Sequence, residues 1–411
     1  MLEGRSVVLG VTGSIAAYKA VEIASQLTQA GAAVDVIMTK SALEFIAPLS
    51  FQALTHRPVV FDLFELQSEM SVEHVGLAER ANIVTVAPAT ANVIAKMANG
   101  IADDSLTCTV LATRAPVLVV PAMNYNMYEN TVTQENIEKL RRRGFTIMEP
   151  SYGRLASGAV GRGRLPEICD IIGTIRQVLG RTGDLAGRRL VVTAGGTQEP
   201  IDPARLVTNR STGKMGYAIA EAARDRGASV TLIAAPTALP DPVCVRTVHV
   251  QTAVQMRDAV LAAIQGSDAL IMTAAVADFR PAQVQTQKVK KTEARLTLEL
   301  EKNPDILAEV GEIMAGRPEK GPKVVVGFAA ESDDIITNAV DKLRRKNLDM
   351  IVANDITASD SGFAVDTNRV TLIKRSGEIE SLPLLLKSQV AERVLSEVSS
   401  MLQEESRASA R

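Results

Sequence analysis

An acidic residue followed by clustered lysines gives the sequence a candidate site for phosphate chemistry. Asp278 comes just after an apolar run, and three lysines fall within four residues at Lys288, Lys290 and Lys291. A carboxylate can hold Mg²⁺, and ammonium groups nearby can neutralise the oxygens of a triphosphate. Clustered lysines more often form a solvated loop, so the interpretation depends on Asp278 lying close to them.

His74 is one of three histidines and a candidate proton acceptor at neutral pH. It precedes an apolar helical pattern in a glycine-containing segment, where its side chain could face a cleft. The alternative is a structural histidine, which is the commoner role of an isolated one.

Near the start of the chain, an apolar run at residues 7–11 leads into a turn flanked by Gly10 and Gly13. Ser14 can then cap a helix that extends to about residue 30. Backbone N–H groups at such a helix start, with the Ser14 hydroxyl, can bind a phosphate, and Thr39 could add a second hydroxyl. The spacing is not GxGxxG, so an ordinary strand-to-helix turn is the alternative.

Residues 190–216 repeat this arrangement with a longer connection. The apolar run 190–193 is followed by Gly195 and Gly196, and two prolines delay the next helix until Gly213. We expect a long polar loop at the carboxyl end of a strand, where open α/β sheets bind ligands. Residues 211–214 are not a P-loop, since Thr208 and Met215 occupy positions that the motif reserves for other residues.

Apolar runs without alternation recur in both halves of the chain, as in parallel strands covered on both faces. The sequence therefore predicts an α/β fold with two doubly wound, Rossmann-like or flavodoxin-like domains and mostly parallel sheets. We expect the first domain at 1–180, a linker at 181–187 and the second domain at 188–405. A hairpin around Ser376 and Gly377 is expected in the second domain, and residues 151–165 are expected to form a glycine-rich loop.

Composition excludes several classes of partner. The 411 residues carry a net charge of -2, which gives no reason to expect nucleic acid or a membrane surface. Cys108, Cys169 and Cys244 have no metal-binding or disulfide spacing, which favours a cytoplasmic protein. No run of about 18 apolar residues is present that could span a bilayer.

Taken together, these segments resemble a known family. The first half carries Gly13-Ser14-Ile15, His74 and the motifs at 88–92 and 121–124; the second carries 209–216, 274–278, the lysine cluster and 302–305. The chain resembles, over nearly its whole length, the bacterial enzymes of coenzyme A synthesis in which phosphopantothenoylcysteine decarboxylase is fused to phosphopantothenate–cysteine ligase.

For the first domain, the resemblance implies FMN and a decarboxylase. Oxidation of the substrate thiol to a thioaldehyde supplies the electron sink that loss of CO₂ requires, and a flavin can accept the electrons. By resemblance, His74 is the base and Asn124 contacts the substrate carboxyl group. The implied FMN contacts are Gly13, Ser14, Ile15, Thr39, Asn92 and Ser105.

One position departs from the family pattern. Ser157 stands where the family typically has a cysteine that donates a proton in the final reduction, and a hydroxyl is a far weaker acid than a thiol. Ser157 with a water could suffice, Cys169 could substitute, or reduction could be slow and release an enethiol. We expect a competent enzyme, because residues 161–164 of the loop match the family.

For the second domain, the resemblance implies that CTP activates 4'-phosphopantothenate as an acyl-cytidylate, from which L-cysteine displaces CMP. Asp278 would serve Mg²⁺ or the nucleotide, Lys288 would neutralise phosphate charge, and Asn209 would help turn over the acyl-cytidylate. The other implied nucleotide contacts are Met272, Thr273, Ala274, Pro304, Asp305, Ile306, Leu307, Phe328, Lys342 and Lys346. The resemblance also implies a homo-oligomer, with trimers of the first domain and dimers of the second in a dodecamer.

Two other functions compete with this one. A dehydrogenase with two dinucleotide folds would need GxGxxG, which neither half contains. A non-catalytic regulatory flavoprotein of the same fold is the stronger alternative, and Ser157 keeps it open. Intact His74, Asn124, Asn209 and Lys288 argue against it, because a binding module does not need them.

Overall fold

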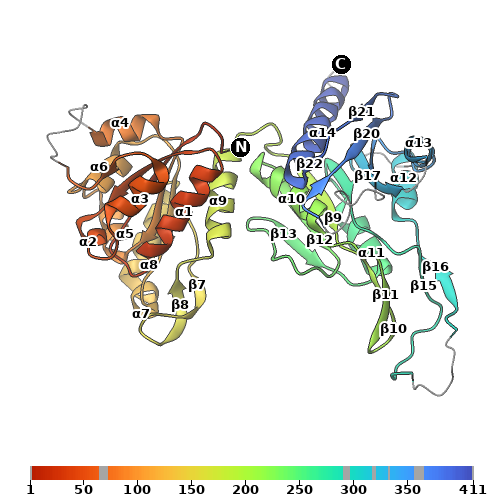
Figure 1. Ribbon diagram of the computed structural model, residues 1–411, viewed down its shortest axis with the longest axis horizontal. Helices are drawn as coiled ribbons and strands as arrows, with labels where there is room; N and C mark the ends of the chain where they lie inside the picture. The colour runs from red at the N-terminus through yellow and green to blue at the C-terminus, as the bar shows by residue number, and fades with distance from the viewer. Residues whose placement is uncertain are drawn as a thin grey trace. The chain divides into compact units, whose positions relative to one another are not determined.

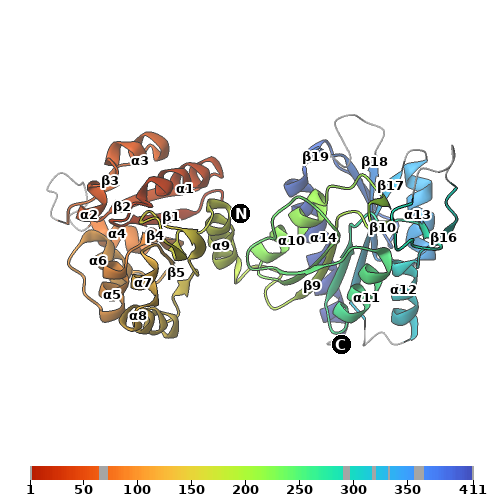
Figure 2. The same cartoon turned by 90° about the horizontal axis from the view of Figure 1, so that it is seen from below.

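The computed structural model describes residues 2–63, 73–289, 297–316, 321–331, 334–355 and 365–409. It divides into two compact units, Met1–Leu179 and Gly180–Arg411, shown in two views in Figures 1 and 2. Two lysines of the predicted cluster, Lys290 and Lys291, lie outside the described residues. In the part that is described, no helix is long and apolar enough to cross a membrane.

The first unit is built on a parallel six-stranded sheet with the strand order β3-β2-β1-β4-β5-β6. This order is that of a doubly wound dinucleotide-binding fold, so the expected fold class is confirmed for this unit. The strands are β1 (Ser6–Val11), β2 (Ala33–Met38), β3 (Val59–Val60), β4 (Ile83–Ala89), β5 (Val117–Pro121) and β6 (Thr146–Ile147).

Helices cover both faces of this sheet and enclose two apolar cores. One core joins α1, α3 and α9 to the sheet, and the other joins α4, α5, α6 and α8 to it. Every residue of β4 is buried, as expected of a central strand. The helices are α1 (Ala17–Gln29), α2 (Lys40–Leu43), α3 (Pro48–Thr55), α4 (Glu73–Arg80), α5 (Ala91–Asn99), α6 (Ser105–Ala112), α7 (Tyr125–Glu129), α8 (Thr131–Arg142) and α9 (Ile168–Gly180).

Two local expectations for the first unit are wrong. Helix α1 begins at Ala17 after Ala16, which makes no side-chain cap; Ser14 only accepts a bond from the Ala16 N–H at 3.3 Å. Residues expected to form a loop instead form an antiparallel hairpin of β7 (Ser151–Arg154) and β8 (Val160–Arg164). The two strands are short and rich in glycine, so the sequence shows only a weak strand pattern. The backbone hydrogen bonds between β7 and β8 stabilise the hairpin nevertheless.

The second unit contains an eight-stranded sheet in the order β13-β12-β9-β14-β17-β18-β20-β21. The strands from β13 to β18 are parallel, and the last two join antiparallel as the expected carboxyl-terminal hairpin. They are β9 (Arg189–Ala194), β12 (Ser229–Ala234), β13 (Arg246–His249), β14 (Ala269–Met272), β17 (Val324–Glu331), β18 (Met350–Asp355), β20 (Val370–Lys374) and β21 (Ile379–Ser381).

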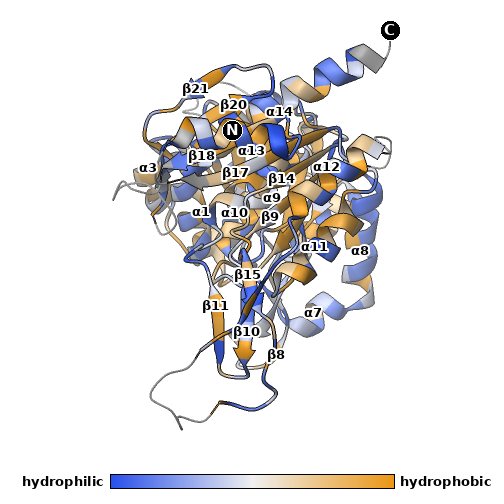
Figure 3. Cartoon of the chain, turned by 90° about the vertical axis from the view of Figure 1, so that its right-hand side faces the viewer, coloured by the Kyte–Doolittle hydropathy of each residue, from blue (hydrophilic) through white to orange (hydrophobic). Residues whose placement is uncertain are grey.

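Helices again cover both faces. One face packs against α10 (Lys214–Asp225) and α14 (Lys387–Ser409); the other packs against α11 (Ala253–Ala263), α12 (Ile306–Gly316) and α13 (Ile335–Arg345). In Figure 3 the hydrophobic colour gathers on the strands and on the helix faces turned toward them. The two cores lie on opposite faces of β14 and β17 and bury the sides of these strands. In such a fold, ligands bind in the crevice outside the carboxyl ends of the strands.

The long polar connection after β9 is partly ordered into strands, which the sequence did not indicate. Antiparallel strands β10 (Gln198–Asp202) and β11 (Arg205–Thr208) form a hairpin. A second hairpin pairs β15 (Phe279–Pro281) with β16 (Leu300–Lys302), and both project from the unit in Figure 1. The short strands β19 (Thr367–Asn368) and β22 (Leu385–Leu386) complete the described strands. Segment 181–187 packs on this unit, with Leu185 fully buried in its core.

A buried carboxylate on β2 links the segment between α3 and β3 to the end of α4. Asp35 is 4% exposed and accepts bonds from Arg57 at 2.7 Å and Arg80 at 3.2 Å. We expect Asp35→Asn to lower the free energy of unfolding by about 1–3 kcal/mol, because two charged bonds are weakened at a buried site. Urea unfolding, read by hydrogen exchange in peptides of the first unit, measures this. Glu138→Gln, which removes an exposed carboxylate, is the control and should change it by less than about 0.5 kcal/mol.

Candidate functional site

The first unit has a cavity of about 480 Å³ at the carboxyl ends of its central strands. Gly13 follows β1, Thr39 follows β2, Asn92 lies in the helix after β4, and Ser105 begins α6; all four line the cavity. The structure thus brings together four of the six predicted cofactor contacts. Ser14 and Ile15 follow Gly13 directly but are not among the lining residues.

Two hydroxyl groups in this cavity lack hydrogen-bond partners. Thr39 and Ser105 are 7% and 3% exposed, and neither Oγ atom has a partner among the described residues. A buried unsatisfied hydroxyl costs about 1–3 kcal/mol, which a ligand oxygen placed in the cavity would recover. The residues present therefore fit a phosphorylated ligand.

The charges at this cavity are mixed. Lys96 lines it and pairs with Asp103 at 2.7 Å and Asp104 at 3.6 Å. The hydrogen bond to Asp103 is the main cause of the raised pKa of Lys96. Lys96 therefore balances these carboxylates, and hydroxyl and backbone groups are left as the main contacts for an anion.

Asn124 and Ser157 lie side by side. The Asn124 amide donates to the Ser157 hydroxyl at 3.3 Å, while its oxygen accepts from the Asn126 N–H at the start of α7. The contact depends on Gly163, where an added Cβ would lie 2.1 Å from the Met123 carbonyl oxygen. This close approach holds the β7–β8 hairpin against the segment that carries Asn124.

His74 is the second residue of α4, which begins where the described range 73–289 begins. Its carbonyl accepts a bond from the Thr109 hydroxyl, which ties α4 to the helix that begins at Ser105. In the described part of the unit, His74, Asn124 and Ser157 do not line the cavity. Met127 does, and it lies in the helix that Asn124 caps. The cavity is therefore connected to His74 through α6, which begins at Ser105, and to Asn124 through α7, which carries Met127.

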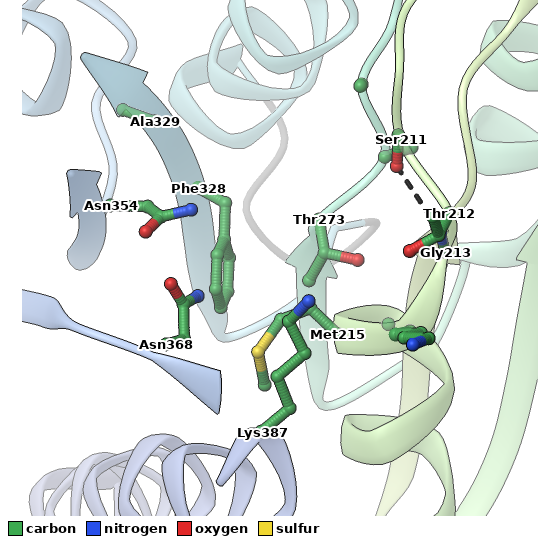
Figure 4. A pocket seen from close by; sticks show the side chains of 14 residues that line it. Ser211, Thr212, Gly213, Met215, Thr273, Phe328, Ala329, Asn354, Asn368 and Lys387 are labelled. Atoms are coloured by element: carbon green, nitrogen blue, oxygen red, sulfur yellow. Dashed lines mark hydrogen bonds between the residues drawn. The ribbon is translucent and has the colours of Figure 1, made fainter. Parts of the chain in front are cut away.

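The second unit has a smaller pocket of about 120 Å³ at the ends of β14 and β17 (Figure 4). Thr273, Ala274 and Phe328, all predicted as nucleotide contacts, line it together with residues 211–216 at the start of α10. Asn209 donates to the carbonyl of Ala275 at 3.2 Å, so its amide is anchored beside the same wall.

Three buried polar residues of this pocket were not predicted. Asn354, Asn368 and Lys387 line it and are 9%, 2% and 6% exposed. Asn354 directly follows an apolar run, and that position at the end of a strand was a usable signal. Asn368 and Lys387 follow no such run, and only the tertiary fold brings them to the pocket.

The remaining predicted residues lie outside this pocket. Met272 is the buried end of β14, while Asp278 and Lys288 are exposed. Next to Lys288, the Val289 N–H donates to Asp202 at 3.2 Å, which holds this segment against the β10–β11 hairpin. Within the described ranges, no group of three or more acidic, histidine or cysteine side chains could hold a metal ion.

A further group of predicted residues gathers around α12 and α13. Asp305 pairs with Lys346 at 2.9 Å, Ile306 is buried and Leu307 packs on the core beneath. Pro304 precedes this segment, and Lys342 lies one helical turn before Lys346 on α13. These residues belong to the face of the sheet opposite α10 and α14.

These observations define a class of protein: a two-unit α/β protein with a ligand cavity at the carboxyl edge of each sheet. Comparison with known proteins identifies the family. The model of the flavoprotein family matches residues 1–180, and that of the DNA/pantothenate metabolism flavoprotein C-terminal domain matches residues 185–402.

Relatives that match this chain over nearly its full length indicate the same family as the two family models. The coenzyme A biosynthesis bifunctional protein CoaBC of Bacillus subtilis is 47% identical over 98% of both chains. That of Mycobacterium tuberculosis is 45% identical over 97% of both. A solved structure of the C-terminal domain of a CoaBC protein is 42% identical, covering 54% of this chain and 99% of that one, with a TM-score of 0.46.

The chain therefore belongs to the family of bifunctional coenzyme A biosynthesis proteins. The expected activities, a decarboxylase and a ligase in one chain, are confirmed at this level, whereas the regulatory alternative is not supported.

The unpaired hydroxyls of the first cavity lead to a prediction. Thr39→Val and Ser105→Ala should each weaken binding of FMN about 5–10-fold, because each removes one hydrogen bond to the ligand. The same changes should leave the unliganded protein as stable or more stable, since the hydroxyls have no partner there. Flavin fluorescence titration of apoprotein measures the affinity.

Ser6→Ala is the matched control for this experiment. Its hydroxyl is also buried and unpaired among the described residues, but it lies at the opposite end of β1. Equal weakening by Ser6→Ala and Ser105→Ala would contradict the assignment.

Proposed function

We propose that the second unit ligates 4'-phosphopantothenate to L-cysteine with CTP, and that the first unit decarboxylates the product with FMN. The domains are taken as 1–180 and 188–405 with a linker at 181–187. Support comes from a ligand cavity at the carboxyl edge of each sheet, each within the part of the chain that a different family model matches. The main observation for placing the flavin phosphate in the first cavity is that the buried hydroxyls of Thr39 and Ser105 have no hydrogen-bond partner among the described residues.

In the ligase reaction the carboxylate of 4'-phosphopantothenate attacks the α-phosphate of CTP and pyrophosphate leaves. Lys288 neutralises the charge that grows on the leaving phosphates. Asp278, exposed just before β15, would hold Mg²⁺, which usually binds through one or two carboxylates and the substrate phosphates. The amide of Asn209, anchored to Ala275, orients the acyl-cytidylate while the amine of cysteine displaces CMP.

In the decarboxylase reaction Gly13, Thr39, Asn92 and Ser105 would hold FMN, which would supply a reversible acceptor for the two electrons of the substrate thiol. His74 removes the proton during the oxidation. The Asn124 amide orients the substrate carboxylate, and its bond to Ser157 places that hydroxyl at the same group. Ser157, with a water, delivers the final proton.

The chain is further proposed to work in the cytoplasm as a homo-oligomer, with trimers of the first unit and dimers of the second in a dodecamer. Large exposed apolar side chains support association of the first unit: Tyr18 of α1 is 61% exposed and Leu49 of α3 is 71% exposed, on helices that contact each other. Light scattering of the full chain measures the mass of the assembly.

One experiment tests both activities. The full chain is supplied with 4'-phosphopantothenate, cysteine, CTP and Mg²⁺, and the products are identified by mass spectrometry. We expect 4'-phosphopantetheine, CMP and pyrophosphate from a yellow protein. Lys288→Gln should abolish ligation but still decarboxylate added 4'-phospho-N-pantothenoylcysteine, and His74→Asn should accumulate that intermediate. A yellow protein that releases no pyrophosphate would exclude the proposal.

Ser157 generates a separate prediction. Ser157→Ala should raise the ratio of enethiol to 4'-phosphopantetheine at least several-fold, because the alanine cannot donate a proton. Ser157→Cys should lower that ratio. Cys169→Ser is the control, and product ratios come from mass spectrometry. Should Cys169→Ser raise the ratio while Ser157→Ala does not, Cys169 is the donor instead.

A further inference from the structure

The central strand β1 of the first unit ends where the order of the sheet reverses. In the order β3-β2-β1-β4-β5-β6, the chain runs to one edge of the sheet from β1 and to the other edge from β4. The ladder between these two strands ends at the pair Gly10 and Val86. Beyond that pair the two backbones separate, and the crevice that opens there is where such folds bind a ligand.

Thr12 bridges the two strands just beyond that point. Its hydroxyl donates to the carbonyl of Pro88 at 2.7 Å and accepts from the N–H of Thr90 at 3.0 Å. Thr12 is 0% exposed, so its hydroxyl is shielded from water. One side chain therefore takes the place of the backbone ladder where β1 and β4 separate.

Thr90 connects this bridge to the first turn of α5. It is the N-cap of that helix, and its own hydroxyl accepts from the Val93 N–H at 3.4 Å. Asn92 lies in the same turn and lines the cavity. Because the Thr12 hydroxyl holds the N–H of the cap residue, it also fixes the place of the turn that carries Asn92.

The residues on either side of Thr12 hold a second part of the cavity. The carbonyl of Val11 accepts from the Thr39 N–H at 3.0 Å. At Gly13 an added Cβ would lie 2.4 Å from the Ser41 Cβ, so the turn after β1 lies directly against the segment after β2. Gly13, Thr39 and Ser41 all line the cavity. This short segment therefore contacts the chain after β2 and the chain after β4 at the same time.

A third part of the cavity is fitted to the same segment. At Gly10 an added Cβ would lie 2.4 Å from the Cδ1 of Leu106, which follows the cavity residue Ser105 at the start of α6. In these contacts the neighbours of Thr12 use their backbone. Thr12 is therefore the residue of this segment where a substitution can remove one contact and leave the others.

We propose that Thr12 is a positioning residue of the flavin site, whose hydroxyl holds the segments after β1 and β4 in the arrangement that binds FMN. Thr12 is not among the described residues that line the cavity, so its effect on a ligand passes through these two segments. The proposal rests on the proposed binding of FMN in this cavity. It adds a residue that acts on the cofactor without touching it.

The test compares Thr12→Val with Thr12→Ser by titrating apoprotein of the full chain with FMN and following flavin fluorescence. Valine has nearly the shape of threonine but no hydroxyl, so it leaves a buried N–H and a buried carbonyl without their partner. The segment after β4 must shift to satisfy these groups, and FMN binding must reverse that shift. We expect Thr12→Val to weaken FMN binding about 10–100-fold. Thr12→Ser keeps the hydroxyl and should stay within about threefold of the wild type.

Thr85 on β4 provides a matched control. It is also 0% exposed, but its hydroxyl has no hydrogen-bond partner among the described residues. Thr85→Val therefore makes the same chemical change at the same burial without breaking a bond. It should leave the affinity for FMN within about twofold of the wild type.

Measurements of stability separate positioning from a purely structural role. A ligand stabilises the folded protein in proportion to the logarithm of its affinity, so unfolding by urea is compared with and without FMN. A residue that only supports the fold would lower both stabilities equally and leave the titrated affinity unchanged. Thr12→Val should instead reduce the stabilisation that FMN provides. If Thr12→Val does not fold, Thr12→Cys, whose thiol is a weak donor and acceptor, should bind FMN more weakly than Thr12→Ser.

Failure of this inference can be told from failure of the proposed function. A wild-type chain that binds no FMN in the titration would overturn the cofactor assignment itself. A wild type that binds FMN, with a Thr12→Val variant that binds it as tightly as Thr85→Val does, overturns the positioning role alone. Equal weakening by Thr12→Val and Thr12→Ser would show that the shape of the side chain sets the affinity, which also overturns the role of the hydroxyl.

Discussion

Both units depend on one constraint: parallel strands covered on two faces leave only their ends for polar chemistry. All seven residues of β4 and five of the six in β9 are buried. Since such strands carry few charged side chains, of which the doubly paired Asp35 is one, most polar residues collect in the segments at the carboxyl edge. Thr39 and Ser105 in one unit, and Asn209 and Thr273 in the other, occupy such positions. The same physical rule thus builds a candidate site at the carboxyl edge of each sheet.

Close backbone approach then shapes each site. In the second unit an added Cβ at Gly216 would lie 2.5 Å from the Thr273 hydroxyl and 2.6 Å from the Thr193 carbonyl. The missing side chain lets α10 press against β9 and β14, which narrows the pocket between them. Gly163 does the same for the hairpin that carries Ser157. Both sites therefore require particular glycines as well as polar groups.

Elements whose residues show a clear local pattern could be predicted from the sequence alone. Buried strands such as β12 and β18 and the hairpin at Gly377 were predicted because their patterns are local. The β7–β8 and β10–β11 hairpins were missed, since their short strands contain glycines or prolines that favour loops. Lys387 could not be predicted either. It lines a pocket only because α14 returns to the sheet after the carboxyl-terminal hairpin, and nothing nearby in the sequence encodes that return.

The last helix has a consequence for how the two activities can be lost. Six residues between Val390 and Leu402 are buried at 0–1% exposure in the core of the second unit. Two ion pairs also tie this helix to the antiparallel strands: Lys374 of β20 pairs with Glu397 at 2.6 Å, and Glu380 of β21 pairs with Arg393 at 2.6 Å. Because Lys387 at the start of α14 lines the pocket of the second unit, a premature stop codon there would remove one wall of that pocket. The first unit, complete by Leu179, would keep its whole core after such a truncation, so under the proposed assignment damage at the carboxyl terminus is selective for ligation.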